Sequence, residues 1–130
     1  MVKYMYKDAN GVIDINKSYI KKPNQYEILP EIVEYLIKKL DPRMIILFGS
    51  CARGVITVHS DIDLCIVVEE KLDVKERVKI RSELLMDLID ISDFEVYLFI
   101  CGIEDWEKKH KDQGTFIGKI YKEGKTIYGR

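Results

Sequence analysis

The segment LFGSCARGVITVHSDIDLCIVV, residues 47–68, carries the residues that decide the fold of this chain. Its first two residues end an apolar run of strand length, MIILF at residues 44–48, and Asp61 and Asp63 stand at the start of a second run. Because alternate side chains of a strand share a face, both carboxylates are expected on one side, with Cα atoms about 6 to 7 Å apart. Two carboxylates at that separation repel each other. The pair therefore predicts a bound metal, basic neighbours or a solvated strand end.

The residues upstream of the aspartates favour a phosphate site. Gly49 and Ser50 follow the first apolar run, and a glycine followed by a small hydroxyl residue is typical of a tight turn into a helix whose free backbone N–H groups receive phosphate. Gly49 and Gly54 also have the spacing of a P-loop. Val55 and Ile56, however, occupy the positions where that motif needs Lys and Ser or Thr, so a P-loop is excluded.

Length and composition limit the classes of protein to consider. A chain of 130 residues predicts one domain, residues 1–130, with one real core. The net charge of −1 gives no basic footprint, so direct nucleic-acid binding is not expected. Cys51, Cys65 and Cys101 lack CxxC spacing and are interpreted as reduced thiols in apolar surroundings. Neither a signal peptide nor an apolar run of about eighteen residues is visible, which predicts a cytoplasmic protein without a membrane span.

Apolar periodicity and turn residues predict the secondary structure. A loose alternation around DANG suggests an N-terminal hairpin within residues 3–19, and Pro30 is expected in the first turn of a helix. Asp73 with Glu76 resembles a capping box at the start of a helix that runs to about Ile91. The predicted elements are helix 30–40, strands 44–48 and 61–68, helix 73–91, strand 92–100, helices 103–111 and 115–122, and strand 125–128. This order predicts an α/β (α+β) fold with a small mixed sheet packed against helices.

The combination of these motifs resembles a known family. Gly49-Ser50, ten intervening residues and Asp61-Ile62-Asp63 are similar to the GSx10DxD pattern of the minimal nucleotidyltransferases, within the DNA polymerase β-like superfamily. GSCARG and SDIDL also resemble the common GSxARG and SDxDL forms, and the C-terminal KIYKEGKTIY is similar to the usual family ending. The resemblance covers residues 30–128 and implies a single nucleotidyltransferase domain.

The resemblance assigns a role to each matched residue. It implies that Asp61 and Asp63 bind the Mg²⁺ ions that clamp a nucleoside triphosphate, ATP above all. Gly49 would let the backbone approach the phosphates, and Ser50 would offer its hydroxyl and its N–H to them. Arg53 has two interpretations: a fixed cation near the phosphates, or a partner of a local carboxylate.

A third carboxylate from the neighbouring strand completes the site in the family. Asp93 and Glu95 are both expected on one face of strand 92–100, so spacing alone does not separate them. The apolar-acid-apolar-apolar pattern of the family matches FEVY and selects Glu95 as a catalytic residue and metal ligand. The family usually has aspartate there, and the additional methylene of glutamate shifts the carboxylate by about an ångström. A solvated pair at a strand end is the alternative.

The implied activity is Mg²⁺-dependent transfer of AMP from ATP to a hydroxyl group. The chain has no room for its own acceptor-binding domain, and stand-alone family members resemble antitoxins paired with a HEPN-domain toxin, so the implied acceptor is a tyrosine of such a toxin. Two alternatives remain: an aminoglycoside-type, small-molecule nucleotidyltransferase, and a non-catalytic antitoxin or binding module with the same fold. Trp106 and the tyrosines are expected to be core or interface residues.

Overall fold

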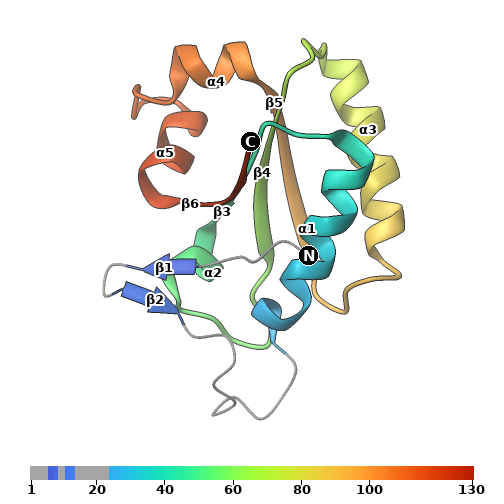
Figure 1. Cartoon of the computed structure of the whole chain (residues 1–130), viewed down its shortest axis with the longest axis vertical. Helices are drawn as coiled ribbons and strands as arrows, with labels where there is room; N and C mark the ends of the chain where they lie inside the picture. Colours follow the sequence, from blue (N-terminus) through green and yellow to red (C-terminus); the bar gives the residue numbers. More distant parts are fainter. Residues whose placement is uncertain (1–5, 9–10, 14–23) are drawn as a thin grey trace.

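The computed structural model of the chain describes residues 6–8, 11–13 and 24–130 (Figure 1). Within these residues the elements are, in order, β1 (Tyr6–Asp8), β2 (Gly11–Ile13), α1 (Gln25–Leu40), β3 (Met44–Phe48), α2 (Gly49–Arg53), β4 (Ile62–Val68), α3 (Val74–Leu88), β5 (Val96–Gly102), α4 (Ile103–Lys109), α5 (Phe116–Glu123) and β6 (Lys125–Gly129). The predicted mixed α/β fold is confirmed.

The central sheet has four strands in the order β5-β4-β3-β6. β3 pairs antiparallel with β4 and β6, while β4 pairs parallel with β5, and α3 makes the crossover that a parallel pair requires. In this register Asp63 lies opposite Phe48 of β3 on one side and opposite Tyr97 of β5 on the other. The register therefore places one of the two aspartates in the middle of three neighbouring strands.

Helices cover both faces of this sheet. In Figure 1, α1 and α3 lie on one side of the strands, and α4 and α5 lie on the other. On one face, an apolar cluster joins α1 and α3 to Leu64 and Leu98 of the sheet. On the other face, a second cluster joins Trp106 of α4 and Ile120 of α5 to Cys65. Strands buried on both faces are expected to be continuously apolar. This explains why MIILF and LCIVV lack polar alternation.

Helix α1 begins earlier than predicted. Its N-cap is Asn24, whose side chain accepts a hydrogen bond from the N–H of Tyr26 at 2.9 Å, so Pro30 lies inside the helix and not in its first turn. The correct signal was in the sequence: Asn24 is followed three residues later by Glu27, a typical pattern for a helix start. The side-chain cap, and not the fixed φ of Pro30, sets the first turn.

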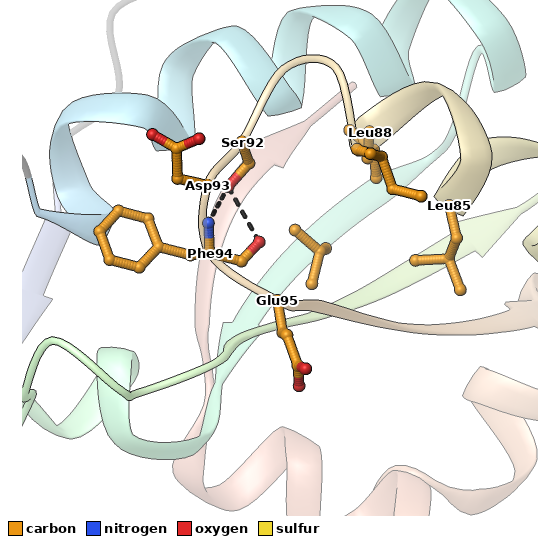
Figure 2. A pocket seen from close by; sticks show the side chains of 8 residues that line it. Leu85, Leu88, Ser92, Asp93, Phe94 and Glu95 are labelled. Carbon is orange, nitrogen blue, oxygen red and sulfur yellow. Dashed lines mark hydrogen bonds between the residues drawn. The ribbon is translucent and has the colours of Figure 1, made fainter.

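The segment between α3 and β5 also differs from the prediction. The Asp73–Glu76 capping box is present, but α3 ends at Leu88, before Ile91. The hydroxyl of Ser92 donates to the carbonyl of Phe94 at 3.1 Å and accepts from its N–H at 3.0 Å, which closes a local turn (Figure 2). Side-chain bonds of this kind compete with strand pairing. β5 consequently begins at Val96, and residues 92–95 precede the strand.

The N-terminal hairpin is confirmed in part. β1 and β2 pair antiparallel, with Tyr6 opposite Ile13 and Asp8 opposite Gly11. Residues 3–5, 9–10 and 14–19 of the predicted hairpin lie outside the described residues. The three cysteines are free and buried, as expected. In the part of the chain that the structure describes, no helix is long and apolar enough to cross a membrane.

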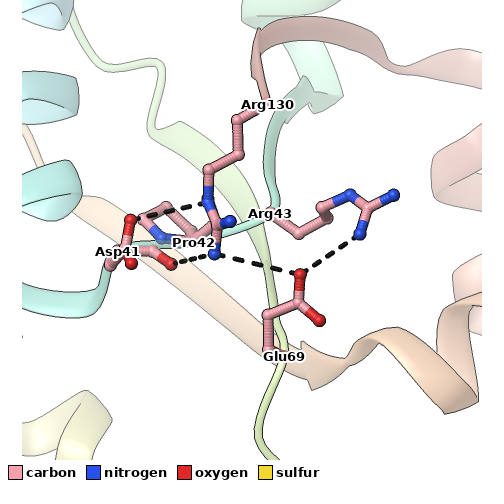
Figure 3. A network of polar contacts seen from close by, with 5 residues as sticks. All are labelled: Asp41, Pro42, Arg43, Glu69 and Arg130. Atoms are coloured by element: carbon pink, nitrogen blue, oxygen red, sulfur yellow. Dashed lines mark hydrogen bonds and ion pairs between the residues drawn. The ribbon is translucent and has the colours of Figure 1, made fainter.

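Arg130 joins the end of β6 to the start of β3 (Figure 3). Its guanidinium donates to the carbonyls of Pro42 and Asp41, both at 3.0 Å, and also forms ion pairs with Asp41 and Glu69 at 3.5 and 3.8 Å. Arg43 contacts the same Glu69 at 3.2 Å. Exposed ion pairs contribute little to stability, so the main effect is positional. The network fixes the end of the sheet opposite to Asp63.

Candidate active site

Asp61 and Asp63 lie at the mouth of β4, as the sequence predicted. Asp61 directly precedes the strand and is exposed, while Asp63 is its second residue and is partly buried. Asp63 shares its face of the sheet with Cys65, which packs with the residues of α4 and α5. The charge of Asp61 is one of the causes that raise the pKa of Asp63, so the two carboxylates act on one another.

The Gly49 backbone meets the Asp63 carboxylate directly. Gly49 has φ of 70°, a left-handed conformation that favours glycine. A Cβ atom at this position would collide with the Asp63 carboxylate, and its nearest neighbour would be Oδ2. Ser50 follows at the start of α2 and is partly buried. The structure thus brings the glycine-serine turn next to the Asp63 carboxylate, although Asp63 lies more than ten residues further along the chain.

The electrostatics of the pair favour a bound cation. The pKa of Asp63 is raised to about 6, first by burial and then by the charge of Asp61. The positive charge of Arg53 opposes this shift, so Arg53 acts on the pair through space. The pKa of Asp63 is nevertheless raised, which means that protein groups only partly neutralise the negative charge of the ionised pair. Both interpretations of Arg53, a phosphate contact and a carboxylate partner, agree with this position.

Cys51 contacts the segment that carries the two aspartates. Its Sγ donates to the main-chain carbonyl of Asp61 at 3.3 Å. The pKa of the Cys51 thiol is raised to about 12, chiefly by burial and further by the charges of Asp63 and Asp61. Cys51 therefore remains a protonated donor at neutral pH, in agreement with its predicted use as a small buried residue.

The first turn of α1 holds the segments that carry the site. The buried side-chain amide of Gln25 donates to the carbonyls of Thr57 and Ser60, both at 2.8 Å. The hydroxyl of Tyr26 donates to the carbonyl of Cys51 at 2.7 Å. These bonds tie α2, and the loop that leads into Asp61, to α1. Gln25 and Tyr26 lie outside the helix predicted from the sequence, which begins at Pro30, so their roles were not predicted.

The two candidates for the third carboxylate do not share a face, contrary to the sequence-based expectation. Figure 2 shows the side chains of Asp93 and Glu95 directed to opposite sides. Asp93 belongs to the turn that Ser92 closes, whereas Glu95 directly precedes β5, and its main-chain carbonyl accepts a hydrogen bond from the N–H of Ile62 at 2.9 Å. Val96 packs against the α1–α3 cluster, so the alternation along the chain puts Glu95 on the Asp63 side.

The structure does not gather the three proposed ligands into one group. Among the described residues, no three His, Cys, Asp or Glu side chains are close enough to hold a metal ion together. The role of Glu95 therefore stays a prediction. A cavity of about 370 Å³ lies beside it, and most of its lining is apolar. The apolar residues include Leu85 and Leu88 of α3 and Phe94 of the segment that leads into β5 (Figure 2).

The donor set fits a hard divalent cation with a phosphate ligand. Asp61 and Asp63 supply carboxylate oxygens, which Mg²⁺ prefers. Gly49 lets the Asp63 carboxylate lie where a Cβ would otherwise stand, and Ser50, the next residue in sequence, carries a hydroxyl. This arrangement is suited to hold a metal–phosphate group at the edge of the sheet.

The raised pKa of Asp63 predicts a pH-dependent stability. The folded chain keeps the Asp63 proton up to about pH 6, whereas the unfolded chain releases it near pH 3.8. Ionised Asp63 therefore destabilises the fold above about pH 6, and this penalty is absent below about pH 4. We expect Asp63→Asn to raise Tm by about 5 °C near pH 7.5, and to leave it unchanged near pH 4. Thermal unfolding without divalent cations measures this.

The exposed Asp93 offers a matched control for that experiment. We expect that Asp93→Asn does not raise Tm more near pH 7.5 than near pH 4. A lower Tm for Asp63→Asn than for the wild type at neutral pH would contradict the proposed repulsion between the two carboxylates.

Comparison with known proteins identifies solved structures that are similar to this chain. No curated protein matches the chain. A solved toxin-antitoxin with AMP-PNP has 24% identity and a TM-score of 0.52, with 77% of this chain and 73% of that chain covered. A candidate nucleotidyltransferase from Sulfolobus solfataricus has 20% identity and a TM-score of 0.53, with 80% and 79% covered. A mutant of the toxin-antitoxin MntA-HpeT has 26% identity and a TM-score of 0.50, with 84% and 75% covered.

The family model described as Polymerase beta, Nucleotidyltransferase matches residues 30–130. This range includes Gly49, Ser50, Asp61 and Asp63, and it contains every strand of the four-stranded sheet. The match covers more than half of the chain, and the similar structures share the fold. The chain therefore belongs to the polymerase beta nucleotidyltransferase family.

Proposed function

We propose that this chain transfers AMP from ATP to a hydroxyl group with the help of Mg²⁺, and that it acts in the cytoplasm as the antitoxin of a HEPN-domain toxin. The close approach of the Asp63 carboxylate to the Gly49 backbone carries the proposal, because a carboxylate suited to bind Mg²⁺ lies beside a glycine-serine turn suited to receive phosphate. Membership in the nucleotidyltransferase family supports the reaction class. The identity of the nucleotide, of the metal and of the acceptor is proposed in addition to this reaction class.

Each residue of the site has a role in this proposal. Asp61 and Asp63 hold Mg²⁺, which supplies charge neutralisation at the reacting phosphates. Gly49 admits the triphosphate close to the backbone, and Ser50 donates to its terminal part. Arg53, whose charge already acts on Asp63, balances the remaining negative charge.

The proposed transfer is an in-line displacement at the α-phosphorus of ATP. The acceptor oxygen forms a bond to this phosphorus, the bond to the bridging oxygen of the β-phosphate breaks, and pyrophosphate leaves with the electron pair. Glu95, on the Asp63 side of the sheet, takes the hydroxyl proton. The Glu95 carboxylate has to approach the aspartate pair when substrates bind.

The proposed acceptor is a tyrosine of a partner toxin. Two of the similar structures are toxin-antitoxins, one of them with AMP-PNP, and this supports an adenine nucleotide and a protein partner for the present chain. The described residues form a four-stranded sheet with its helices and a two-stranded sheet. In the proposal, a partner protein carries the acceptor hydroxyl.

Transfer of labelled AMP tests the proposal. The purified chain is incubated with ATP labelled at the α-phosphate, Mg²⁺ and the protein encoded by the neighbouring gene. We expect label on a tyrosine of that protein, and no label with Asp61→Ala/Asp63→Ala. We also expect Glu95→Gln to lower the rate by about 100-fold, the usual effect of losing a general base, and Asp93→Asn to leave it unchanged.

The same materials distinguish the non-catalytic alternative. If the wild type transfers no label and Asp61→Ala/Asp63→Ala still neutralises the partner in full, the chain is a binding module with a nucleotidyltransferase fold. Label on an aminoglycoside and none on the partner would favour the small-molecule alternative. Equal rates for Glu95→Gln and the wild type would remove Glu95 from the reaction.

Gly49, the first residue of α2, and Gly54, its C-cap, give a matched pair of variants for the phosphate site. Gly49 and Gly54 both have left-handed backbones, with φ of 70° and 76°. A Cβ at residue 49 meets the Asp63 carboxylate, whereas a Cβ at residue 54 meets no atom within 4 Å. Both variants lose about 1 kcal/mol from backbone strain. We expect only Gly49→Ala to weaken binding of Mg²⁺ with a non-hydrolysable ATP analogue, by at least tenfold, as measured by calorimetry.

The comparison of the two variants separates local geometry from general destabilisation. If Gly54→Ala weakens nucleotide binding as much as Gly49→Ala, the effect arises from strain in α2 and not from contact with Asp63. Unchanged affinity in Gly49→Ala would exclude this turn as the phosphate site.

A further inference from the structure

Two half-exposed aromatic rings flank the catalytic edge of the sheet. Tyr97 lies opposite Asp63 in the parallel β4–β5 register and is 41% exposed. Paired residues of neighbouring strands share a face, so the Tyr97 ring stands on the same face as the Asp63 carboxylate. Phe116, the first residue of α5, is 47% exposed. Aromatic rings with this exposure next to a polar site are typical of contact surfaces.

A buried ring, Phe48, and a partly buried ring, Phe99, hold these two aromatic residues in place. The buried Phe48 ring makes edge contacts with Tyr97 and with Phe116, at centroid distances of 6.3 and 5.9 Å. Phe116 also packs edge-on against Phe99 at 5.0 Å. Tyr97 and Phe116 thus form a pre-ordered surface, here called the aromatic shelf. A ligand that binds there loses little affinity to the ordering of protein side chains.

The position of the aromatic shelf relative to the phosphate turn indicates its ligand. Gly49 follows β3, on one side of Asp63, and Tyr97 belongs to β5, on the other side. In an in-line displacement the leaving group and the attacking oxygen lie on opposite sides of the phosphorus. If the triphosphate tail lies at Gly49 and Ser50, as in the proposed function on which this inference rests, the acceptor approaches from the β5 side.

We infer that the aromatic shelf, with Tyr97 as its main residue, recognises the acceptor and selects a hydroxyl carried by a planar aromatic group. The phenol of a tyrosine side chain satisfies this requirement, because its ring packs on Tyr97 while its hydroxyl reaches toward the aspartate pair. A serine or a sugar hydroxyl makes no such ring contact. Tyr97 acts in acceptor recognition through its ring, and its own hydroxyl is not required.

Steady-state transfer of labelled AMP to the neighbouring-gene protein tests this role. We expect Tyr97→Ala to raise KM for the acceptor protein by about tenfold, while kcat and KM for ATP stay within about twofold. Tyr97→Phe keeps the ring and retains the wild-type KM, and Phe116→Ala gives a smaller rise. Tyr121→Ala is the matched control, because Tyr121 is an exposed tyrosine of α5 that packs on Trp106 and His110.

Two results would overturn the inference. A tenfold rise in KM for ATP with an unchanged KM for the acceptor assigns the ring to the nucleobase, and unchanged values for both substrates remove it from recognition.

A second measurement does not depend on transfer: calorimetric titration of the acceptor protein in the presence of Mg²⁺ and a non-hydrolysable ATP analogue. We expect Tyr97→Ala to weaken this binding by about tenfold, and equal affinity contradicts the inference.

Thermal unfolding of each variant keeps folding defects apart from recognition. Weaker acceptor binding by Tyr97→Ala, combined with no transfer by the wild type, means that the proposed reaction is wrong and the contact is right. Transfer by the wild type, combined with unchanged acceptor affinity in Tyr97→Ala, means that the proposed reaction is right and the contact with Tyr97 is wrong.

Discussion

The close approach of the Asp63 carboxylate to the Gly49 backbone is the constraint on which the rest of the site depends. The left-handed φ of 70° and the space beside the carboxylate both require glycine at position 49. Asp61 adds a second negative charge to the same edge, and burial adds a desolvation penalty at Asp63. A fold selected only for stability would avoid this combination, and functional sites are where such local conflicts are expected. A cation and a phosphate group resolve it.

Long-range pairing sets the geometry of this edge. The β3–β4 register puts Phe48 beside Asp63, and the β4–β5 register puts Tyr97 on its other side. The amide of Gln25 then fixes the loop that enters β4, through two carbonyls that are 32 and 35 residues away. At the far end of the sheet, Arg130 joins β6 to the residues that precede β3. The site is therefore assembled on strands whose two ends are both restrained.

Local sequence signals predicted much of this architecture. The apolar run 44–48, the Asp73–Glu76 capping box and the Gly49-Ser50 turn depend on neighbouring residues, and all three occur in the structure. The start of α1 was predictable as well, from Asn24 and Glu27, but the stronger helix signal of Pro30 concealed it.

Features that depend on tertiary contacts were not predictable in the same way. The strand pattern of residues 92–100 placed Asp93 and Glu95 on one face, and the Ser92 turn separates them. The exposure of Tyr97 follows from the parallel register and the packing of Phe48, neither of which periodicity contains. For the same reason the sequence grouped Tyr97 with the other tyrosines, as core or interface material.

The central claim is that Asp61 and Asp63 hold the metal of a nucleotide whose phosphates contact Gly49. A crystal structure with Mn²⁺ and a non-hydrolysable ATP analogue tests it most directly, because Mn²⁺ is located by its anomalous scattering. We expect an anomalous peak within about 2.5 Å of carboxylate oxygens of both aspartates, with the triphosphate against Gly49 and Ser50. A bound nucleotide whose metal contacts neither aspartate would contradict the account.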